Sequence, residues 1–245
     1  MPVFKTLILI GRPASGKSEF IHAMKQVADA ERAARFHIGP LHELDDFLWL
    51  WEKFTDDDIW ESAGYPRRYS KKSAHGYVVT DGALLDYCFA KFNAEYARIT
   101  TEHPGTLFIE FARGAGDGGY THALNRLSDE LLRDAAILYI DTSYEESCRR
   151  NLARYQEKLK HSILAHKVPD EDMVRFAQHS DWATLTAGAP HGALTIRNIP
   201  VPFVTLDNEI ELTDGTAFQE RCERNLAQLL QLVQTATHGA RRLAA

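Results

Sequence analysis

Residues 3–18 read VFKTLILIGRPASGKS, and this stretch decides the fold. Its first half, residues 3–10, is an apolar run rich in β-forming residues, which predicts a strand buried on both faces. Glycines at 11 and 16 then interrupt the run. Residues 20–28 carry apolar side chains at helical spacing. The stretch therefore predicts a strand, a glycine-rich loop and a helix, in that order.

The loop has the pattern G-x-x-x-x-G-K-S, whose residue types suit phosphate binding. Backbone N–H groups surround the phosphate oxygens, the lysine neutralises the β and γ phosphates, and the serine hydroxyl binds magnesium. A glycine turn that only caps a helix has no need for lysine and serine directly after the second glycine. The predicted phosphate-binding residues are Gly11, Arg12, Pro13, Ala14, Ser15, Gly16, Lys17 and Ser18.

Four further apolar segments predict strands, and the stretches around them have helical spacing. We expect these strands at 36–44, 107–111, 136–141 and 202–206, with helices near 83–99, 124–132, 143–154 and 216–233. Alternating strands and helices imply right-handed crossovers and parallel pairing. We therefore expect an α/β fold: a doubly wound, mainly parallel five-stranded sheet with helices on both faces. Residues 1–245 are expected to form one domain.

The composition narrows the classes of protein. The chain has 245 residues, of which 44% are hydrophobic and 25% charged, as in ordinary soluble globular proteins. Its net charge of -6 argues against nucleic acid as a main partner, since no global basic field is present. Three scattered cysteines predict reduced thiols and a cytoplasmic location. No apolar run is long enough to span a bilayer, so no membrane association is expected.

At residues 11–18 the chain resembles the P-loop nucleoside triphosphate hydrolase superfamily, and the remaining pattern looks like its nucleoside, nucleotide and small-metabolite kinases. The resemblance implies ATP and Mg²⁺ as cofactors and a small-molecule phosphate acceptor. Asp45 and Asp46 resemble the aspartates that orient or deprotonate the acceptor hydroxyl in such kinases. Asp46 is the first choice, although either aspartate would also serve as a helix cap.

Other charged residues fall where these kinases place functional groups. Glu110, at the end of a predicted strand, resembles the acidic residue that organises magnesium or its water. Arg113 follows three residues later and would contact the acceptor or the transferring phosphoryl group, or else form a structural ion pair. Arg150 and Arg154 share one helix face and resemble the arginines of a lid that closes over ATP phosphates. Asn208 lies where related kinases contact adenine.

Two regions are expected to build on this core. Residues 46–103 predict a helical insertion on the acceptor side, and residues 149–181 predict the lid. A basic cluster at Arg67, Arg68, Lys71 and Lys72 would bind an anionic group or remain a solvated loop.

Two alternatives stay open at this stage. Residues 114–119 read GAGDGG and fit the G-x-G-x-x-G pattern of dinucleotide sites, although the phosphate-binding loop already occupies the first strand-to-helix turn. We interpret this second glycine pattern as a flexible loop on the substrate side. The alternative function is an ATP-binding switch that engages a protein partner without a small-molecule acceptor.

Overall fold

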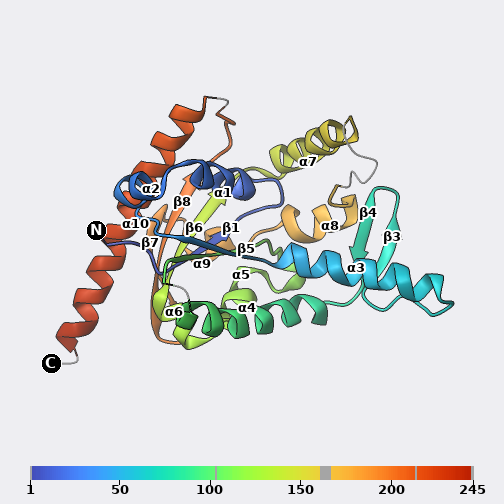
Figure 1. The fold of residues 1–245 in the computed structure, drawn as a ribbon, viewed down its shortest axis with the longest axis horizontal. Coiled ribbons are helices and arrows are strands. Elements are labelled where there is room, and N and C mark those ends of the chain that lie inside the picture. The colour runs from blue at the N-terminus through green and yellow to red at the C-terminus, as the bar shows by residue number, and fades with distance from the viewer. Residues whose placement is uncertain (1, 103, 161–166, 213, 244–245) are drawn as a thin grey trace.

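The computed structural model describes residues 2–102, 104–160, 167–212 and 214–243. A mainly parallel sheet crosses the molecule, with helices on both of its faces (Figure 1). The strand order within the described residues is β2-β5-β1-β6-β8-β7. These strands are β1 Thr6–Ile10, β2 Leu41–Asp45, β5 Thr106–Phe111, β6 Ala135–Asp141, β7 His191–Ile196 and β8 Ile199–Asp207. The predicted doubly wound α/β fold is confirmed.

The described sheet has one strand more than the five expected from the sequence. The first five strands in the sheet order pair in parallel, whereas β7 pairs antiparallel with β8. Arg197 and Asn198 join β7 to β8, with φ angles of 45° and 65°. Two left-handed residues in a row make a two-residue hairpin turn of the favoured twist. That turn carries no glycine, so no strong turn signal in the sequence predicts the added edge strand.

The two faces of the sheet bury different helices, because alternate residues of each strand point to opposite sides. Leu7 and Leu9 of β1 pack with the helices α1 and α10. Ile8 and Ile10 pack with α4, α5 and α6. The bounds of the helices are α1 Lys17–Gln26, α2 Asp29–Arg35, α3 Asp46–Ser62, α4 Ala83–Glu102, α5 Gly119–Arg126, α6 Asp129–Asp134, α7 Tyr144–Leu159, α8 Asp170–Met173, α9 Trp182–Leu185 and α10 Gly215–Leu243.

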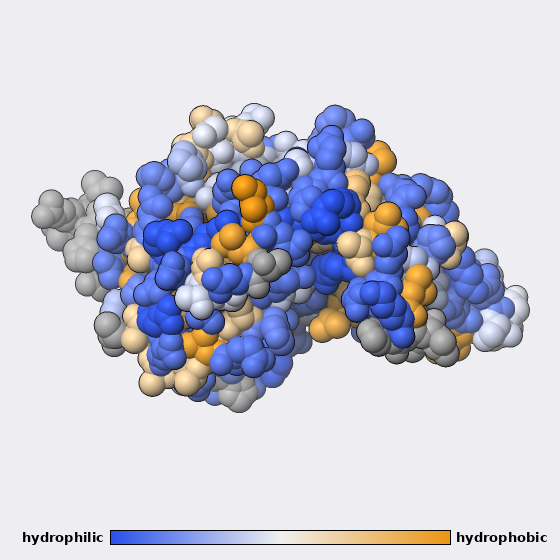
Figure 2. All heavy atoms as spheres, turned by 90° about the horizontal axis from the view of Figure 1, so that it is seen from above, coloured by the Kyte–Doolittle hydropathy of each residue, from blue (hydrophilic) through white to orange (hydrophobic). Residues whose placement is uncertain are grey.

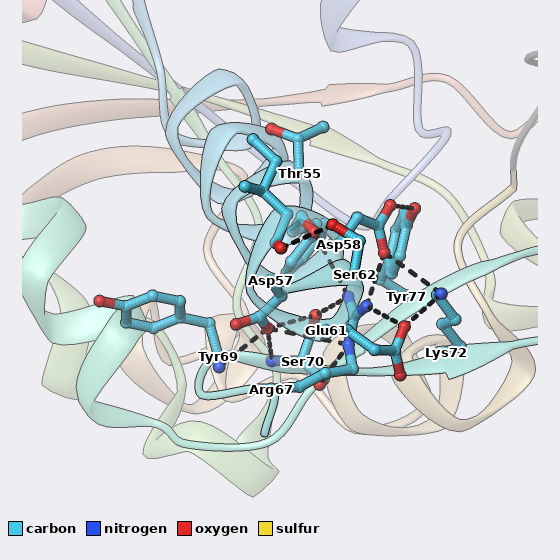
Figure 3. Close-up of polar contacts among 12 residues, drawn as sticks. Thr55, Asp57, Asp58, Glu61, Ser62, Arg67, Tyr69, Ser70, Lys72 and Tyr77 are labelled. Carbon is cyan, nitrogen blue, oxygen red and sulfur yellow. Dashed lines mark hydrogen bonds and ion pairs between the residues drawn. The ribbon is translucent and has the colours of Figure 1, made fainter. Parts of the chain in front are cut away.

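Residues 46–102 form a helix, a hairpin and a helix: α3 and the hairpin extend beyond one end of the sheet, and α4 returns along one of its faces (Figure 1). Helices α3 and α4 were expected, but the hairpin of β3 Ser70–Ser73 and β4 Gly76–Val79 was not. The side chain of Asp57 holds the start of this hairpin against α3. Its carboxylate accepts hydrogen bonds from the backbone N–H groups of Arg68, Tyr69 and Ser70, at 2.8, 3.0 and 2.7 Å (Figure 3).

The segment expected to form the lid packs against this hairpin. The side chain of Asn151 on α7 exchanges two hydrogen bonds with the backbone of Val168. The backbone N–H of Lys167 donates to the carbonyl of His75 in the hairpin turn at 3.1 Å. The described part of the segment continues through α8, a π-helical turn Val174–Gln178 and α9. Residues 161–166 of the predicted lid lie outside the described residues.

Candidate active site

The glycine-rich loop joins β1 to the start of α1, as the sequence predicts. Gly11 and Gly16 have φ angles of 151° and 110°, and Ala14 also lies in the left-handed region at 57°. No side chain caps the first turn of α1. The N–H groups of a helix start attract anions when they lack such a cap. A phosphate-binding loop that leads from the first central strand into a helix characterises P-loop folds. The strand, loop and helix have the arrangement of a P-loop fold.

Lys17 lies within the loop rather than on the surface. Its Nζ donates to the carbonyl oxygens of Gly11 at 3.1 Å and Arg12 at 2.9 Å. Burial lowers the pKa of Lys17, and the carboxylates of Glu110 and Asp45 act in the opposite direction. A buried ammonium held by neutral carbonyls gains energy from an incoming anion. The residues of this loop therefore suit the phosphates of a nucleotide.

Side chains from distant segments fix the loop. Asn208, which follows β8, donates from Nδ2 to the carbonyl of Ser15 at 2.8 Å. A Cβ at Gly16 would lie only 2.4 Å from this Nδ2, so glycine is needed for the close approach as well as for its φ angle. Arg12 donates to the carbonyls of Ala177 at 2.7 Å and Thr142 at 2.6 Å. Asn208 therefore binds the loop from outside, and Arg12 binds the neighbouring segments from within the loop.

Three carboxylates gather next to the loop at the carboxyl ends of two paired strands. Asp45 of β2 lies opposite Glu110 of β5 in the parallel register, and Asp46 follows Asp45. Burial and the nearby charges of Asp46 and Glu110 raise the pKa of Asp45 to about 7. Burial also raises the pKa values of Asp46 and Glu110. The tertiary fold thus brings together the acidic residues that the sequence singled out.

Asp45 and Asp46 have different partners. Oδ1 of Asp45 accepts from the N–H of Phe47 at 2.9 Å and caps α3. Oδ2 of Asp46 lies 2.7 Å from Nη1 of Arg113, and both side chains are buried. The guanidinium of Arg113 also lies 4.9 Å from the ring centre of Phe89. A single carboxylate thus offsets the charge of Arg113 in an apolar setting.

Ser18 and Glu110 also meet, 92 residues apart in sequence. Oγ of Ser18 donates to Oε1 of Glu110 at 3.3 Å. Within the described ranges, no group of three or more His, Cys, Asp or Glu side chains could hold a metal ion. Mg²⁺ usually keeps several waters and binds one or two protein groups together with substrate phosphates. The hydroxyl of Ser18 and the carboxylate of Glu110 fit that kind of site.

Two cavities meet at the phosphate-binding loop. One has a volume of about 240 Å³ and is lined by Lys17, both aspartates and Arg113. The other has a volume of about 200 Å³ and is lined by Gly16, Asn208 and Phe218. Ala14 and Arg154 line both cavities.

The two lid arginines have different surroundings. Arg150 is 5% exposed, and its Nε donates to Glu146 at 2.6 Å. Its Nη2 donates to the carbonyls of Asn208 at 2.7 Å and Glu209 at 3.1 Å. These donors hold the loop after β8, and Arg150 also lines the smaller cavity, so its expected contact with ATP phosphates stays a prediction. Arg154 has a looser contact, 3.7 Å from Glu19, and a half-exposed side chain.

The second glycine pattern is packed at both of its ends, where Gly114 and Gly119 are buried. A Cβ at Gly114 would lie 2.1 Å from the carbonyl oxygen of Arg175. The carboxylate of Asp181 accepts from the N–H groups of Tyr120 and Thr121 at the start of α5, at 2.8 and 2.9 Å. A protein carboxylate thus occupies the position that a dinucleotide phosphate would take. These contacts hold both ends of the segment, and a flexible loop on the substrate side stays a prediction.

The sequence reading missed several residues of the larger cavity. Trp51, Phe54, Tyr77 and Phe176 line it, and so does Asp172. Trp51 ends the aromatic stretch 47–51, which by sequence fits either a helix packed on both sides or the edge of a substrate pocket. Nothing local marks Tyr77 or Asp172, because the hairpin and α8 reach the cavity only through the tertiary fold.

Comparison with known proteins gives a likeness of fold. No family model matches the chain, and no curated protein matches its sequence. A shikimate kinase from Acinetobacter baumannii is 16% identical with a TM-score of 0.39, over 95% of this chain and 94% of that one. A sugar kinase from a Janibacter species is 12% identical with a TM-score of 0.40, over 95% and 98%. At these TM-scores, the likeness carries no weight for function.

In the described residues, no helix is both long enough and apolar enough to cross a membrane. Figure 2 shows one face of the molecule, on which hydrophilic side chains predominate and hydrophobic ones form scattered patches.

Proposed function

We propose that this chain is an ATP-dependent phosphotransferase that moves the γ-phosphoryl group of ATP to a hydroxyl of a small-molecule acceptor. The observation that carries the proposal is the pair of cavities that meet at the phosphate-binding loop, with Ala14 and Arg154 in the lining of both. A nucleotide in one cavity and an acceptor in the other would have their reacting groups close to Lys17. A plain nucleotide-binding switch has no need for the second cavity.

The nucleotide belongs in the cavity of about 200 Å³ in this proposal. Lys17 and the uncapped start of α1 neutralise its phosphates, and Leu212 and Phe218 offer apolar surface to its base. Asn208 holds the loop through Ser15 and acts as a positioning residue. Arg150 has the same kind of role, because it holds the carbonyls of Asn208 and Glu209.

The acceptor belongs in the cavity of about 240 Å³ in this proposal. The insertion at residues 46–103 forms one wall of this cavity, and the segment 149–181 acts as its lid. Asp45 is placed to receive the hydroxyl proton, since a pKa of about 7 suits a general base at neutral pH. Asp46, held by Arg113, orients the same hydroxyl. Arg154, in the lining of both cavities, is placed to offset charge on the transferred group.

Mg²⁺ would bind through Ser18 and Glu110, which already share a hydrogen bond. When bound, the ion supplies charge neutralisation at the phosphate oxygens. Glu110 has its pKa raised by burial, and a nearby cation would favour its ionised form.

The test is ADP formation from MgATP with a panel of nucleosides, nucleotides, sugars and vitamin-like alcohols. We expect acceptor-stimulated turnover that Lys17→Ala abolishes. The matched control is Lys25→Ala on the same helix, because Lys25 is exposed and pairs with Glu43. Equal nucleotide-dependent stabilisation of Lys17→Ala and the parent would refute the assignment of the phosphate site. ADP formation that no acceptor stimulates would favour the switch.

A further inference from the structure

The larger cavity has a wall of aromatic rings. Trp51 and Phe54 come from α3 and Tyr77 comes from β4. The ring centres of Phe54 and Tyr77 lie 5.3 Å apart in a stacked pair, and Trp51 meets Tyr77 edge-on at 5.6 Å. The three rings pack on one another and together give the cavity an aromatic lining, which suits an apolar or planar ring in edge or face contact.

Asp172 of α8 adds one polar group to this lining. The residue is 3% exposed, and its Oδ1 atom has no hydrogen-bond partner. The backbone N–H of Val79 bonds to the same carboxylate. Burial raises the pKa of Asp172 to about 6, so the group is ionised at pH 7.5 and only accepts hydrogen bonds. A buried acceptor without a donor is costly, and a bound molecule with an N–H group would satisfy it.

Three cations of the basic cluster, Arg67, Lys71 and Lys72, are paired with acidic side chains. Arg67 contacts Asp58 at 2.5 Å, and Lys72 contacts Glu61 at 2.5 Å (Figure 3). Lys71 pairs with Glu171 of α8 at 2.6 Å. These three cations are paired with acidic partners from α3 and α8, so the hairpin adds no unpaired cation of theirs to Lys17, Arg113 and Arg154 in the cavity lining.

We propose that the acceptor is a small planar heterocycle that carries a hydroxyl group and a ring-edge N–H donor, and that Asp172 accepts a hydrogen bond from this donor. This inference rests on the proposed function and names its acceptor class. Two sources offer this chemistry, a nucleoside and a hydroxymethyl-substituted heterocycle. The aromatic wall binds the ring, and Asp172 selects the compounds that present a donor.

Binding of three amino-bearing probes, measured by calorimetry at pH 7.5 without ATP, tests the proposal. The probes are adenosine, cytidine and 4-amino-5-hydroxymethyl-2-methylpyrimidine, each compared with the analogue in which hydrogen replaces the amino group. We expect at least one amino compound to bind about ten-fold tighter than its analogue, as a hydrogen bond to a charged group allows. The two nucleosides and the free pyrimidine distinguish the two sources.

Asp172→Asn places an amide in the position of the carboxylate. We expect the preference for the amino compound to fall to about two-fold or less, since one acceptor oxygen becomes a donor. Glu171→Gln, which also removes one acidic charge from α8 but at an exposed site, is expected to keep the preference. A structural role of Asp172 would weaken both members of each ligand pair alike, which would overturn the proposal.

Shikimate, glucose and adenosine 5′-monophosphate complete the panel. Tighter binding of any of these than of all three amino-bearing probes would overturn the inference, and so would the absence of binding of those probes at about 1 mM. Heterocycle binding with the expected preference, but without phosphoryl transfer, would refute only the proposed function. Transfer to a sugar without heterocycle binding would refute only the acceptor class.

Discussion

Replacing Asp45 by asparagine is expected to stabilise the protein, and more so at higher pH. Asp45 caps α3 through a 2.9 Å hydrogen bond from Phe47, and asparagine caps helices about as well as aspartate. The substitution therefore removes a charge and leaves the cap in place. The charge is unfavourable in the folded state because burial and the carboxylates of Asp46 and Glu110 raise the pKa of Asp45 to about 7.

The sign and size follow from the linkage of protonation to folding. The unfolded chain loses the proton of Asp45 near its ordinary pKa of 3.8, whereas the folded chain keeps it until about pH 7. Stability is therefore lost as the pH rises between these values and stays lower above them. The folded and unfolded pKa values of Asp45 differ by about three units, which corresponds to a loss of ~4 kcal/mol in the free energy of unfolding. Contact of Asp45 with water reduces this loss to roughly 2–4 kcal/mol. At pH 4 the expected gain from asparagine is below ~1 kcal/mol.

Urea unfolding followed by circular dichroism at pH 4, 6 and 8 measures the effect. Asp214→Asn is the matched control, because Asp214 is exposed and caps α10 through a 2.9 Å bond from the N–H of Thr216. This control is expected to lose roughly 0.3–1 kcal/mol of dipole interaction at pH 8. A gain for Asp45→Asn that does not change between pH 4 and pH 8 would refute the reasoning, and so would a net loss at pH 8.

Three further substitutions probe the loop, the buried ion pair and the lid. Gly16→Ala is expected to cost ~1–3 kcal/mol in thermal unfolding and to weaken ATP binding, because its φ angle and its neighbours leave no room for a Cβ. Arg113→Ala is expected to cost ~3–5 kcal/mol, and a double variant with Asp46→Asn should cost less than the sum of the two, since it leaves no unpaired buried charge. Arg154→Ala is expected to lower kcat at least about ten-fold, whereas Arg98→Ala on the surface of α4 should leave kcat unchanged.

The parts that the sequence predicted well are local in the chain. The loop at residues 11–18 follows a buried strand and starts a helix, and all the signals for it lie within about two dozen residues. Asp45 and Glu110 could be placed together because both end predicted parallel strands, whose carboxyl ends share one edge of the sheet. The prediction of one helix at 124–132 was less accurate, because the structure has two helices there, α5 and α6, and Ser128 caps the second.

The parts that the sequence did not predict depend on long-range contacts. The sequence placed Arg150 on the lid helix but did not show its hydrogen bonds to the carbonyls of Asn208 and Glu209, which lie about 60 residues later in the loop after β8. The glycines at 114–119 fit a dinucleotide motif by sequence. In the structure the carboxylate of Asp181 binds the N–H groups at the start of α5, where a dinucleotide phosphate would bind. Side-chain partners of this kind leave no periodic or short-range signal in a single sequence.

The sequence by itself determined the α/β class and the glycine-rich loop at residues 11–18. Both are recorded by residues close together in the chain: the apolar pattern of each strand and helix, and the residue types of a phosphate-binding loop. Only the tertiary structure decided the character of the acceptor cavity. Its aromatic wall comes from α3 and the hairpin, and its buried carboxylate, Asp172, comes from α8. These groups are separated by about 100 residues, and packing alone brings them to one surface. The physical reason is that a binding cavity is formed by convergence in space, which a linear pattern does not record.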